Sequence, residues 1–354
     1  MKKRISLMAF IVFLAFIILA FVCGIAISQE NAAIEKWKQR IKNYPVENNN
    51  IEIQLTKTFP ADEEKIFLIE AVSLAHDNEW NIYVADRRNC SIAVFNSKGE
   101  YLHSFGRRGQ GPGDLYYPQN IFIWKNDIVV YEAGNNRIQF FDFNGKSKKH
   151  IKIFKAYHSI ILSKEGLIYG IPRHIIAGTG QKMIDVINLD GMLVNSFGEP
   201  KELLMNVEMG TSAELCFISD ETEILLVYNF IPIIERYSIN GELLSSVRIS
   251  NPIIDDEAKN NQGHLSKGEF GLWIILPAVR TYRNKTYLLH SWPRVEILEL
   301  NNNYNIEANF STIVSWDFHV RDFLVNRDED QITIYCIPRG SYEYMKIHMF
   351  KTKK

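Results

Sequence analysis

Cationic side chains gather in a few short segments of this 354-residue chain, and they offer the chemistry of anion recognition. The candidate ligand-binding residues are Arg87, Arg88, Arg107, Arg108, Arg173, His174, His290, Trp292, Arg294 and Arg339. An arginine side chain presents a planar fork of N–H donors that matches a carboxylate or phosphate group. These residues therefore predict a site for an anionic ligand such as an acidic glycan or a peptide carboxylate.

The charge of the whole chain limits which partners fit such a site. The 40 Lys and Arg residues are balanced by 41 Asp and Glu residues, which gives a formal net charge of -1. A balanced total does not indicate a general nucleic-acid surface, so we expect a protein, peptide or glycan partner and no nucleic acid. The alternative is that these cations are solvated loop charges, with Arg137 tying neighbouring strands together.

Catalysis would need a metal or an acid–base set, and the sequence offers only scattered candidates. His158, His290 and His319 could together hold a metal ion, but their spacing carries no metal-site pattern. The four cysteines show no CxxC spacing, and the chain contains no GxSxG, HExxH or P-loop motif. We therefore assign no catalytic residue, metal or cofactor and take binding or scaffolding as the default. A metal-dependent lyase or hydrolase is the alternative.

The glycine-rich segment of residues 106–113 allows two interpretations. Glycine lets backbone N–H groups approach an anion, which would suit a phosphate cradle. A nucleotide-binding loop should join a parallel strand to a helix, whereas this segment lies between antiparallel strands and ends in Pro112-Gly113. The sequence favours a tight turn.

A repeated β unit must position all of these residues. The turn pairs ending in Gly99, Gly145, Gly191 and Gly241 each follow a β-rich segment and recur every 46 to 50 residues. That period is typical of a β-propeller blade with four short antiparallel strands. Reading the whole chain with this unit gives six blades, of which the last lacks a fourth strand.

The missing strand has a candidate at the start of the repeat region. Residues 51–59 alternate apolar and polar side chains, and pairing them with the last blade would close the ring and cover exposed strand edges. We therefore predict an all-β, six-bladed β-propeller over residues 51–354, with residues 51–59 as its closing strand. The candidate cations would then lie in loops around one mouth of the central channel, where the enzymatic alternative would also place its site.

Several motifs resemble a known repeat family. Val84-Ala85-Asp86 with Asn89, Ile92 and Phe95 looks like the NHL-type repeat, as does the run from Asn135 to Asp142 that precedes Gly145. The segment from Phe105 to Asp114 is similar to the glycine-rich blade connection of exported bacterial six-bladed propellers. The resemblance covers about half of the chain well. It implies a binding or scaffolding domain, although some relatives of such propellers are lyases or hydrolases.

The N-terminal segment predicts the compartment. Lys2, Lys3 and Arg4 precede an apolar run over residues 5–27, which is typical of an export signal. Residues 1–28 are interpreted as a signal peptide or, if retained, as an anchor in the inner membrane, with the propeller in the periplasm or at the cell surface. Residues 29–50 read as a cationic amphipathic helix and a linker. It would contact an anionic membrane surface or serve as a spacer.

Two connections are unusually long. Residues 199–212 and 251–270 exceed the ordinary length of structureless loops, and such insertions often act as lids. The second is expected to hold a short helix over one face. The patterns identify neither the ligand nor an oligomeric state.

Overall fold

The structure is a computed structural model that describes residues 49–61, 66–175, 179–205, 212–218, 220–267, 272–290, 294–312, 319–328, 331–339 and 345–352. These residues belong to one compact unit, residues 47–354. The predicted export segment and nearly all of the predicted amphipathic helix and linker lie outside the described residues. Within the described part, no helix is long and apolar enough to cross a bilayer.

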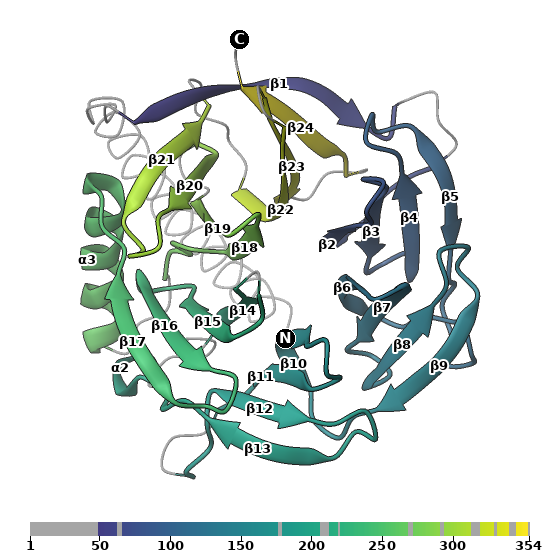
Figure 1. Ribbon diagram of the computed structural model, residues 1–354, viewed down its shortest axis with the longest axis horizontal. Helices are drawn as coiled ribbons and strands as arrows, with labels where there is room; N and C mark the ends of the chain where they lie inside the picture. Colours follow the sequence, from purple (N-terminus) through teal and green to yellow (C-terminus); the bar gives the residue numbers. More distant parts are fainter. Residues whose placement is uncertain are drawn as a thin grey trace, which may run out of the picture. The chain divides into compact units, whose positions relative to one another are not determined.

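In the described part of this unit, 24 strands form six blades arranged around an axis (Figure 1). Blades 1 to 3 comprise β2 (Ala71–His76), β3 (Ile82–Asp86), β4 (Ser91–Phe95), β5 (Tyr101–Phe105), β6 (Pro118–Trp124), β7 (Asp127–Glu132), β8 (Arg137–Phe141), β9 (Ser147–Lys152), β10 (Tyr157–Leu162), β11 (Ile168–Pro172), β12 (Ile184–Ile187) and β13 (Leu193–Phe197). Blades 4 to 6 comprise β14 (Ala213–Phe217), β15 (Glu223–Tyr228), β16 (Ile233–Ser238), β17 (Leu243–Arg248), β18 (Ala278–Tyr282), β19 (Lys285–His290), β20 (Glu296–Leu300), β21 (Ile306–Ser311), β22 (His319–Arg327), β23 (Ile332–Arg339), β24 (Ile347–Thr352) and the first strand of the chain, β1 (Asn50–Phe59). The predicted all-β propeller of four-stranded antiparallel blades is confirmed.

The first strand joins the last two blades. From Ile53 onward, β1 runs antiparallel to β24 and forms the outermost strand of blade 6. Its first residues, Asn50 to Glu52, run parallel to β21 of blade 5. Blades 5 and 6 therefore share one eight-stranded sheet, and the segment that precedes blade 1 in the sequence completes the ring.

The core is divided among the junctions between blades. Six clusters of buried apolar residues lie in the described structure, one between each pair of neighbouring blades. The second strand of a blade is therefore covered on both faces. All five residues of β3 are buried, whereas most of β17, the outermost strand of blade 4, is exposed. This explains why the second strands read as continuous apolar runs, because a strand covered on both faces has no polar side.

The repeated turn glycines have a conformational and a packing reason. Gly99, Gly145, Gly191 and Gly241 all have a positive φ, between 72° and 94°, which costs glycine little. Each turn also presses against the outermost strand of the preceding blade. A Cβ atom at Gly241, for example, would lie 2.6 Å from a ring carbon of Phe197. The glycines that revealed the period therefore hold neighbouring blades together at the rim.

Among the described residues, helices occupy two of the connections between blades. α2 (Glu202–Met205) is a single turn, and α3 (Pro252–Lys267) is the helix expected in the second long connection. Asn251 caps α3, because its Oδ1 accepts a hydrogen bond from the Ile254 backbone N at 2.8 Å. Ile254 and Ala258 pack into the core between blades 4 and 5, and Leu265 packs into the core between blades 3 and 4.

Candidate functional site

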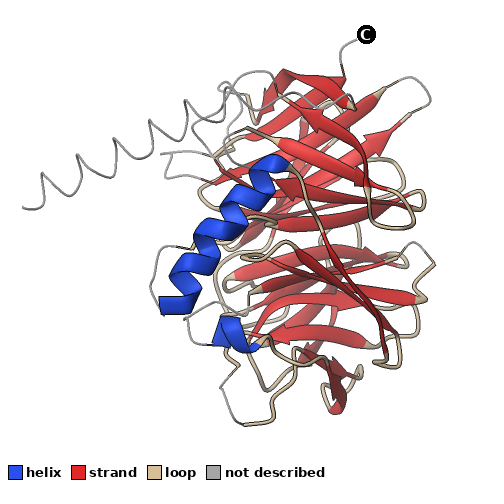
Figure 2. Ribbon diagram, turned by 90° about the vertical axis from the view of Figure 1, so that its left-hand side faces the viewer, coloured by secondary structure: helices blue, strands red, loops and turns tan. Residues whose placement is uncertain are grey.

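One face of the ring, here called the loop face, carries the connections between blades and the loop from the second to the third strand of each blade. Because neighbouring strands are antiparallel, both kinds of connection emerge on this face. Helices α2 and α3 lie there as well, on the same side of the blades (Figure 2). Nine of the ten predicted ligand-binding residues lie in these loops or at the adjoining strand ends. Trp292 lies outside the described residues.

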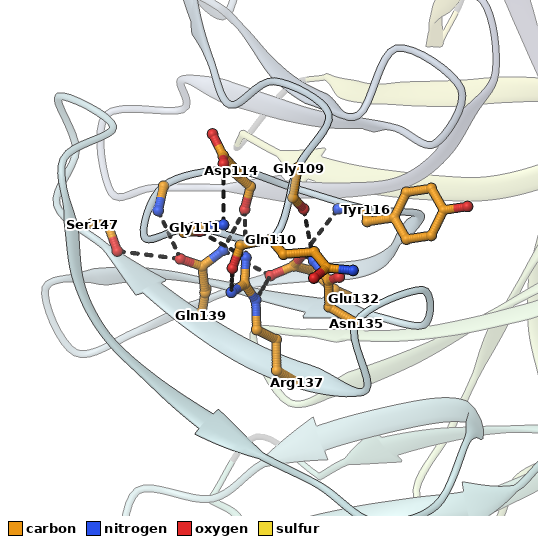
Figure 3. A network of polar contacts seen from close by, with 11 residues as sticks. Gly109, Gln110, Gly111, Asp114, Tyr116, Glu132, Asn135, Arg137, Gln139 and Ser147 are labelled. Atoms are coloured by element: carbon orange, nitrogen blue, oxygen red, sulfur yellow. Dashed lines mark hydrogen bonds and ion pairs between the residues drawn. The ribbon is translucent and has the colours of Figure 1, made fainter.

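A buried polar network in blade 2 fixes the glycine-rich connection, residues 106–113 (Figure 3). Its centre is the carboxylate of Glu132, which is fully buried at the end of β7. This carboxylate accepts hydrogen bonds from Arg137 Nε at 2.7 Å and Gln139 Nε2 at 2.7 Å. It also accepts one from the Tyr116 backbone N at 2.9 Å. The network joins β7 and β8 to the connection that enters β6.

The orientation of the glycine-rich connection excludes a phosphate cradle. The guanidinium of Arg137 also donates to the carbonyl oxygens of Gln110, Gly111 and Asp114, at 2.6, 3.1 and 2.7 Å. The connection thus turns carbonyl oxygens toward a buried cation, whereas an anion site needs several N–H groups aimed at one point. Arg137 ties this turn to blade 2, and the segment is a tight turn between blades.

Buried carboxylates recur near the loop-face ends of the second or third strands in five blades. They are Asp86, Glu132, Asp185, Glu235 and Glu296. Each accepts hydrogen bonds from its own blade or from the connection above it, as Asp86 does from the Ile69 backbone N at 2.7 Å. These carboxylates have local partners, which gives them a structural role.

Blade 5 uses this arrangement to hold α3. His290, at the end of β19, is fully buried. Its Nδ1 lies 2.7 Å from Glu296 Oε2 on β20, and its Nε2 lies 2.9 Å from Glu257 Oε2 on α3. Arg294 Nε donates to the other oxygen of Glu296 at 2.8 Å. The predicted ligand residues His290 and Arg294 are therefore engaged within the protein, and His290 does not reach the surface.

Charge accounts for the protonation of this cluster. Burial alone would lower the pKa of His290, but the charges and hydrogen bonds of Glu257 and Glu296 outweigh burial and raise that pKa to about 10. Burial likewise opposes ionisation of Glu296, yet its hydrogen bond with His290 helps lower its pKa to about 2. The pKa of Glu257 is raised, chiefly by burial. His290 is thus a buried cation between two glutamates.

The arginines that surround Glu70 form a different arrangement. Glu70 directly precedes β2, and Arg87 forms hydrogen bonds with both of its carboxylate oxygens. Arg88 Nε lies 3.6 Å and Arg321 Nη1 lies 3.7 Å from the same carboxylate. Burial would raise the pKa of Glu70, but the three guanidiniums lower it. Three cations thus gather around one carboxylate; we call these four residues the Glu70 cluster.

The remaining predicted cations lie in separate loops. Arg107 pairs with Asp114 at 2.8 Å and is 85% exposed, and the guanidinium of Arg108 lies 5.1 Å from the centre of the Tyr116 ring. Arg173 and His174 are exposed in the loop after β11. Arg339 ends β23, opposite His319 in the register of β22. The described structure therefore does not gather the predicted set into one site.

The innermost strands carry polar residues at the same end of the ring. In β22, β2, β6 and β10, the pairing register shifts just after the first or second residue, as at a β-bulge. The residue that each shift skips is Arg321, Val72, Gln119 and His158 respectively, and three of these four are polar. A bulge can turn a side chain away from the regular alternation of a strand. His158 Nε2 lies 3.5 Å from Glu214 Oε1 on β14, and Arg280 of β18 pairs with Asp322 of β22.

The histidines of the enzymatic alternative occupy different surroundings. His158 contacts a carboxylate on β14, whereas His290 is enclosed beneath α3. Among the residues that the structure describes, no group of three or more His, Cys, Asp or Glu side chains is arranged to hold a metal ion. The described residues thus give the metal-dependent alternative no specific support.

Sequence reasoning missed the acidic partners and Arg321. Glu70 was overlooked because it lies in the connection before the first blade, 17 residues from Arg87. Its position directly before an innermost strand was the available signal. Glu257 could not be assigned, because only the packing of α3 brings it to His290.

Sequence comparison with known proteins assigns the chain to a family of propellers. A family profile described as a 6-bladed beta-propeller, DUF5128, matches residues 60–246. The chain belongs to this family. It is also 39% identical over 59 residues to the human E3 ubiquitin-protein ligase NHLRC1, which confirms the NHL-type resemblance. That match covers 16% of this chain and spans only 15% of the length of the human protein.

Solved structures agree on the fold. A member of the DUF4221 family from Bacteroides vulgatus matches with a TM-score of 0.57 and 11% identity, over 87% of this chain and 100% of that one. A Bacteroides fragilis protein provisionally described as exported matches with a TM-score of 0.56 and 10% identity, over 86% of this chain and 99% of that one. An inactive variant of virginiamycin B lyase from Staphylococcus aureus, solved with quinupristin, matches with a TM-score of 0.53 and 12% identity, over 85% of this chain and 100% of that one. At these identities the likeness concerns the fold alone.

Proposed function

We propose that the protein is an extracytoplasmic binding module whose loop face recognises an anionic ligand at the Glu70 cluster. The observation that carries the proposal is the gathering of Arg87, Arg88 and Arg321 around a single carboxylate. Glu70 fixes Arg87 by two hydrogen bonds, and Arg88 places a largely exposed positive charge beside this pair. A carboxylate or phosphate group of a ligand would balance that charge.

Arg88 is the residue most available to the ligand. Its side chain is 71% exposed, and it approaches Glu70 only to 3.6 Å, beyond hydrogen-bond distance. Its guanidinium can therefore turn toward a ligand without breaking a hydrogen bond to Glu70. Arg87 holds the carboxylate that keeps the cluster together. The carboxylate also makes the site selective, because it repels an anion that approaches from its side.

Two observations support a location outside the cytoplasm. Three basic residues precede the apolar run of residues 5–27, as in an export signal. One of the solved structures that share the fold is also provisionally described as an exported protein. We propose the periplasm or the cell surface, with the apolar segment either removed or retained as an anchor.

The test measures binding of an acidic probe to the full-length protein in detergent. A fluorescent hexaglutamate peptide would be titrated by anisotropy, with oligogalacturonate and inorganic phosphate as competitors. A charge-assisted hydrogen bond contributes about 1.5–3 kcal/mol, so we expect Arg88→Ala to weaken binding roughly 10-fold to 100-fold. Binding should also weaken as salt increases.

Arg283→Ala is the matched control. Arg283 is exposed in the turn between β18 and β19, on the face opposite the loop face. This variant removes the same charge from the chain and should leave the affinity unchanged. Equal losses of affinity in Arg88→Ala and Arg283→Ala would show a nonspecific charge effect. An unchanged affinity in Arg88→Ala or Arg321→Ala would refute the proposed site.

A further inference from the structure

The loop face over blades 1 to 3 displays exposed aromatic side chains at matching positions. Phe67, Tyr117 and Phe154 are 50%, 43% and 81% exposed. Each lies within four residues before the innermost strand of a blade, β2, β6 and β10 respectively. These three strands lie next to one another around the axis (Figure 1). The aromatic residues therefore follow one arc of the loop face.

An arginine lies near each of these aromatic residues. Arg88 follows β3 in the loop beside Phe67, whose carbonyl oxygen accepts a hydrogen bond from Asn89 Nδ2 at 2.8 Å. Arg108 stacks over Tyr116, whose ring lies 4.6 Å from that of Tyr117. The Arg173 backbone N donates to the Ala156 carbonyl oxygen at 2.9 Å, which places Arg173 beside the connection that carries Phe154. We call Phe67, Arg88, Arg108, Tyr117, Phe154 and Arg173 the aromatic arc.

The chain itself covers the opposite part of the loop face. α3 buries Ile254 and Ala258 against blades 4 and 5, and Asn261 Nδ2 donates to the carbonyl oxygens of Phe230 and Trp273. Leu204 of α2 and Leu265 of α3 pack over the junction of blades 3 and 4. No comparable helix is present over blades 1 and 2 among the described residues. The exposed aromatic side chains thus lie on the part of the face without α2 or α3.

We infer that the aromatic arc binds an acidic polypeptide segment that also carries apolar side chains. This inference rests on the proposed function, because the Glu70 cluster lies at one end of the arc and would take an acidic side chain. Arginine and aromatic residues are enriched where protein interfaces gain most of their affinity. Phe154 has no polar group, so its exposed ring suits an aliphatic or aromatic side chain better than a charge alone. The arginines supply the complementary charge.

Two peptides of equal charge test this inference on the full-length protein. One alternates Glu and Leu over eight residues, and the other alternates Glu and Ser. We expect the Glu-Leu peptide to bind about tenfold more tightly, since its leucine side chains can be buried against the exposed aromatic rings and serine side chains cannot replace that contact. Phe154→Ala should remove most of that difference and leave the Glu-Ser affinity unchanged. Leu193→Ala, which removes an exposed apolar side chain from β13 at the rim, should leave both affinities unchanged.

The outcomes separate this inference from the proposed function. Equal affinities for both peptides, both lowered by Arg88→Ala, would overturn the inference and leave the anion site intact. Tighter binding of oligogalacturonate than of either peptide, insensitive to Phe154→Ala, would replace the polypeptide with an acidic glycan. If the Glu-Leu peptide binds in a manner that depends on Phe154 and not on Arg88, the anion site is wrong, and the inference of an acidic ligand is overturned with it.

Discussion

Replacing His290 with glutamine tests the cluster that holds α3 to blade 5. The imidazolium is fully buried and bridges Glu257 on α3 and Glu296 on β20. Glutamine cannot carry the charge, so the variant leaves two buried carboxyl groups close together, with Arg294 paired to Glu296. Removing one partner of a buried ion pair costs roughly 3–5 kcal/mol. We expect the free energy of unfolding to fall by that amount at pH 6.

The pH dependence of stability reports on the same contacts by a second measurement. The pKa of His290 rises from an ordinary 6.5 to about 10 on folding. The contribution of His290 is fully present below pH 6.5, where both states are protonated, and it is lost as pH rises toward 10. Each pKa unit corresponds to about 1.4 kcal/mol, so the whole shift corresponds to about 5 kcal/mol. Between pH 7 and pH 9, the wild-type protein should lose about 3 kcal/mol from this cause.

Urea unfolding followed by tryptophan fluorescence at pH 6, 7, 8 and 9 would measure both effects. His290→Gln should show the lower stability at pH 6 and a flatter dependence between pH 7 and pH 9. His150→Gln is the control, because His150 is exposed on β9 and should change neither value. If His290→Gln and the wild-type protein lose stability equally from pH 7 to pH 9, a buried imidazolium between two glutamates is the wrong description.

Two other substitutions test the joints between blades. Arg137→Lys should lower the free energy of unfolding by roughly 3 kcal/mol, because an ammonium group cannot reach Glu132 and the three carbonyl oxygens together; urea unfolding measures the loss, and a change below 1 kcal/mol would contradict it. Gly241→Ala should cost about 1–3 kcal/mol, since it combines a positive φ with a clash against Phe197. Gly180 also has a positive φ, but nothing lies within 4 Å of a Cβ added there. Comparing the thermal unfolding of Gly241→Ala with that of Gly180→Ala therefore separates the clash from the backbone strain.

The fold was predictable because its joints leave a periodic signal. Gly145 and Gly241 mark turns that need a positive φ and a close approach by the preceding blade, and few residues other than glycine satisfy both. The signal weakens in blade 5 for a visible reason. There Tyr304 takes the positive φ of the turn, and its buried ring lies 5.1 Å from the guanidinium of Arg236. In blade 5, a tyrosine at this turn contacts the preceding blade in place of a glycine, so the repeat is harder to recognise in the sequence.

The candidate site was predictable only in residue type. Arg87, Arg88 and Arg294 were recognised as loop cations, but the sequence does not show which carboxylate each one meets. Glu70 lies before the first complete blade, and Glu257 lies in an insertion that the repeat does not describe. A repeat pattern predicts where a loop lies on the ring. It does not predict what an insertion folds against.

The buried carboxylates explain which loop cations remain available for binding. The loops on the loop face lie above buried carboxylates, and hydrogen bonds to these carboxylates fix the shape of the loops. We call such a carboxylate the anchor of its loop. Glu132 and Glu296 provide this anchor by accepting hydrogen bonds from the Nε atoms of Arg137 and Arg294. Arg88 lies in blade 1, whose anchor, Asp86, binds backbone N–H groups and Asn89 instead. Asp86 thus holds the loop through groups other than the Arg88 guanidinium, and we propose that this difference separates a binding arginine from a structural one on the same face.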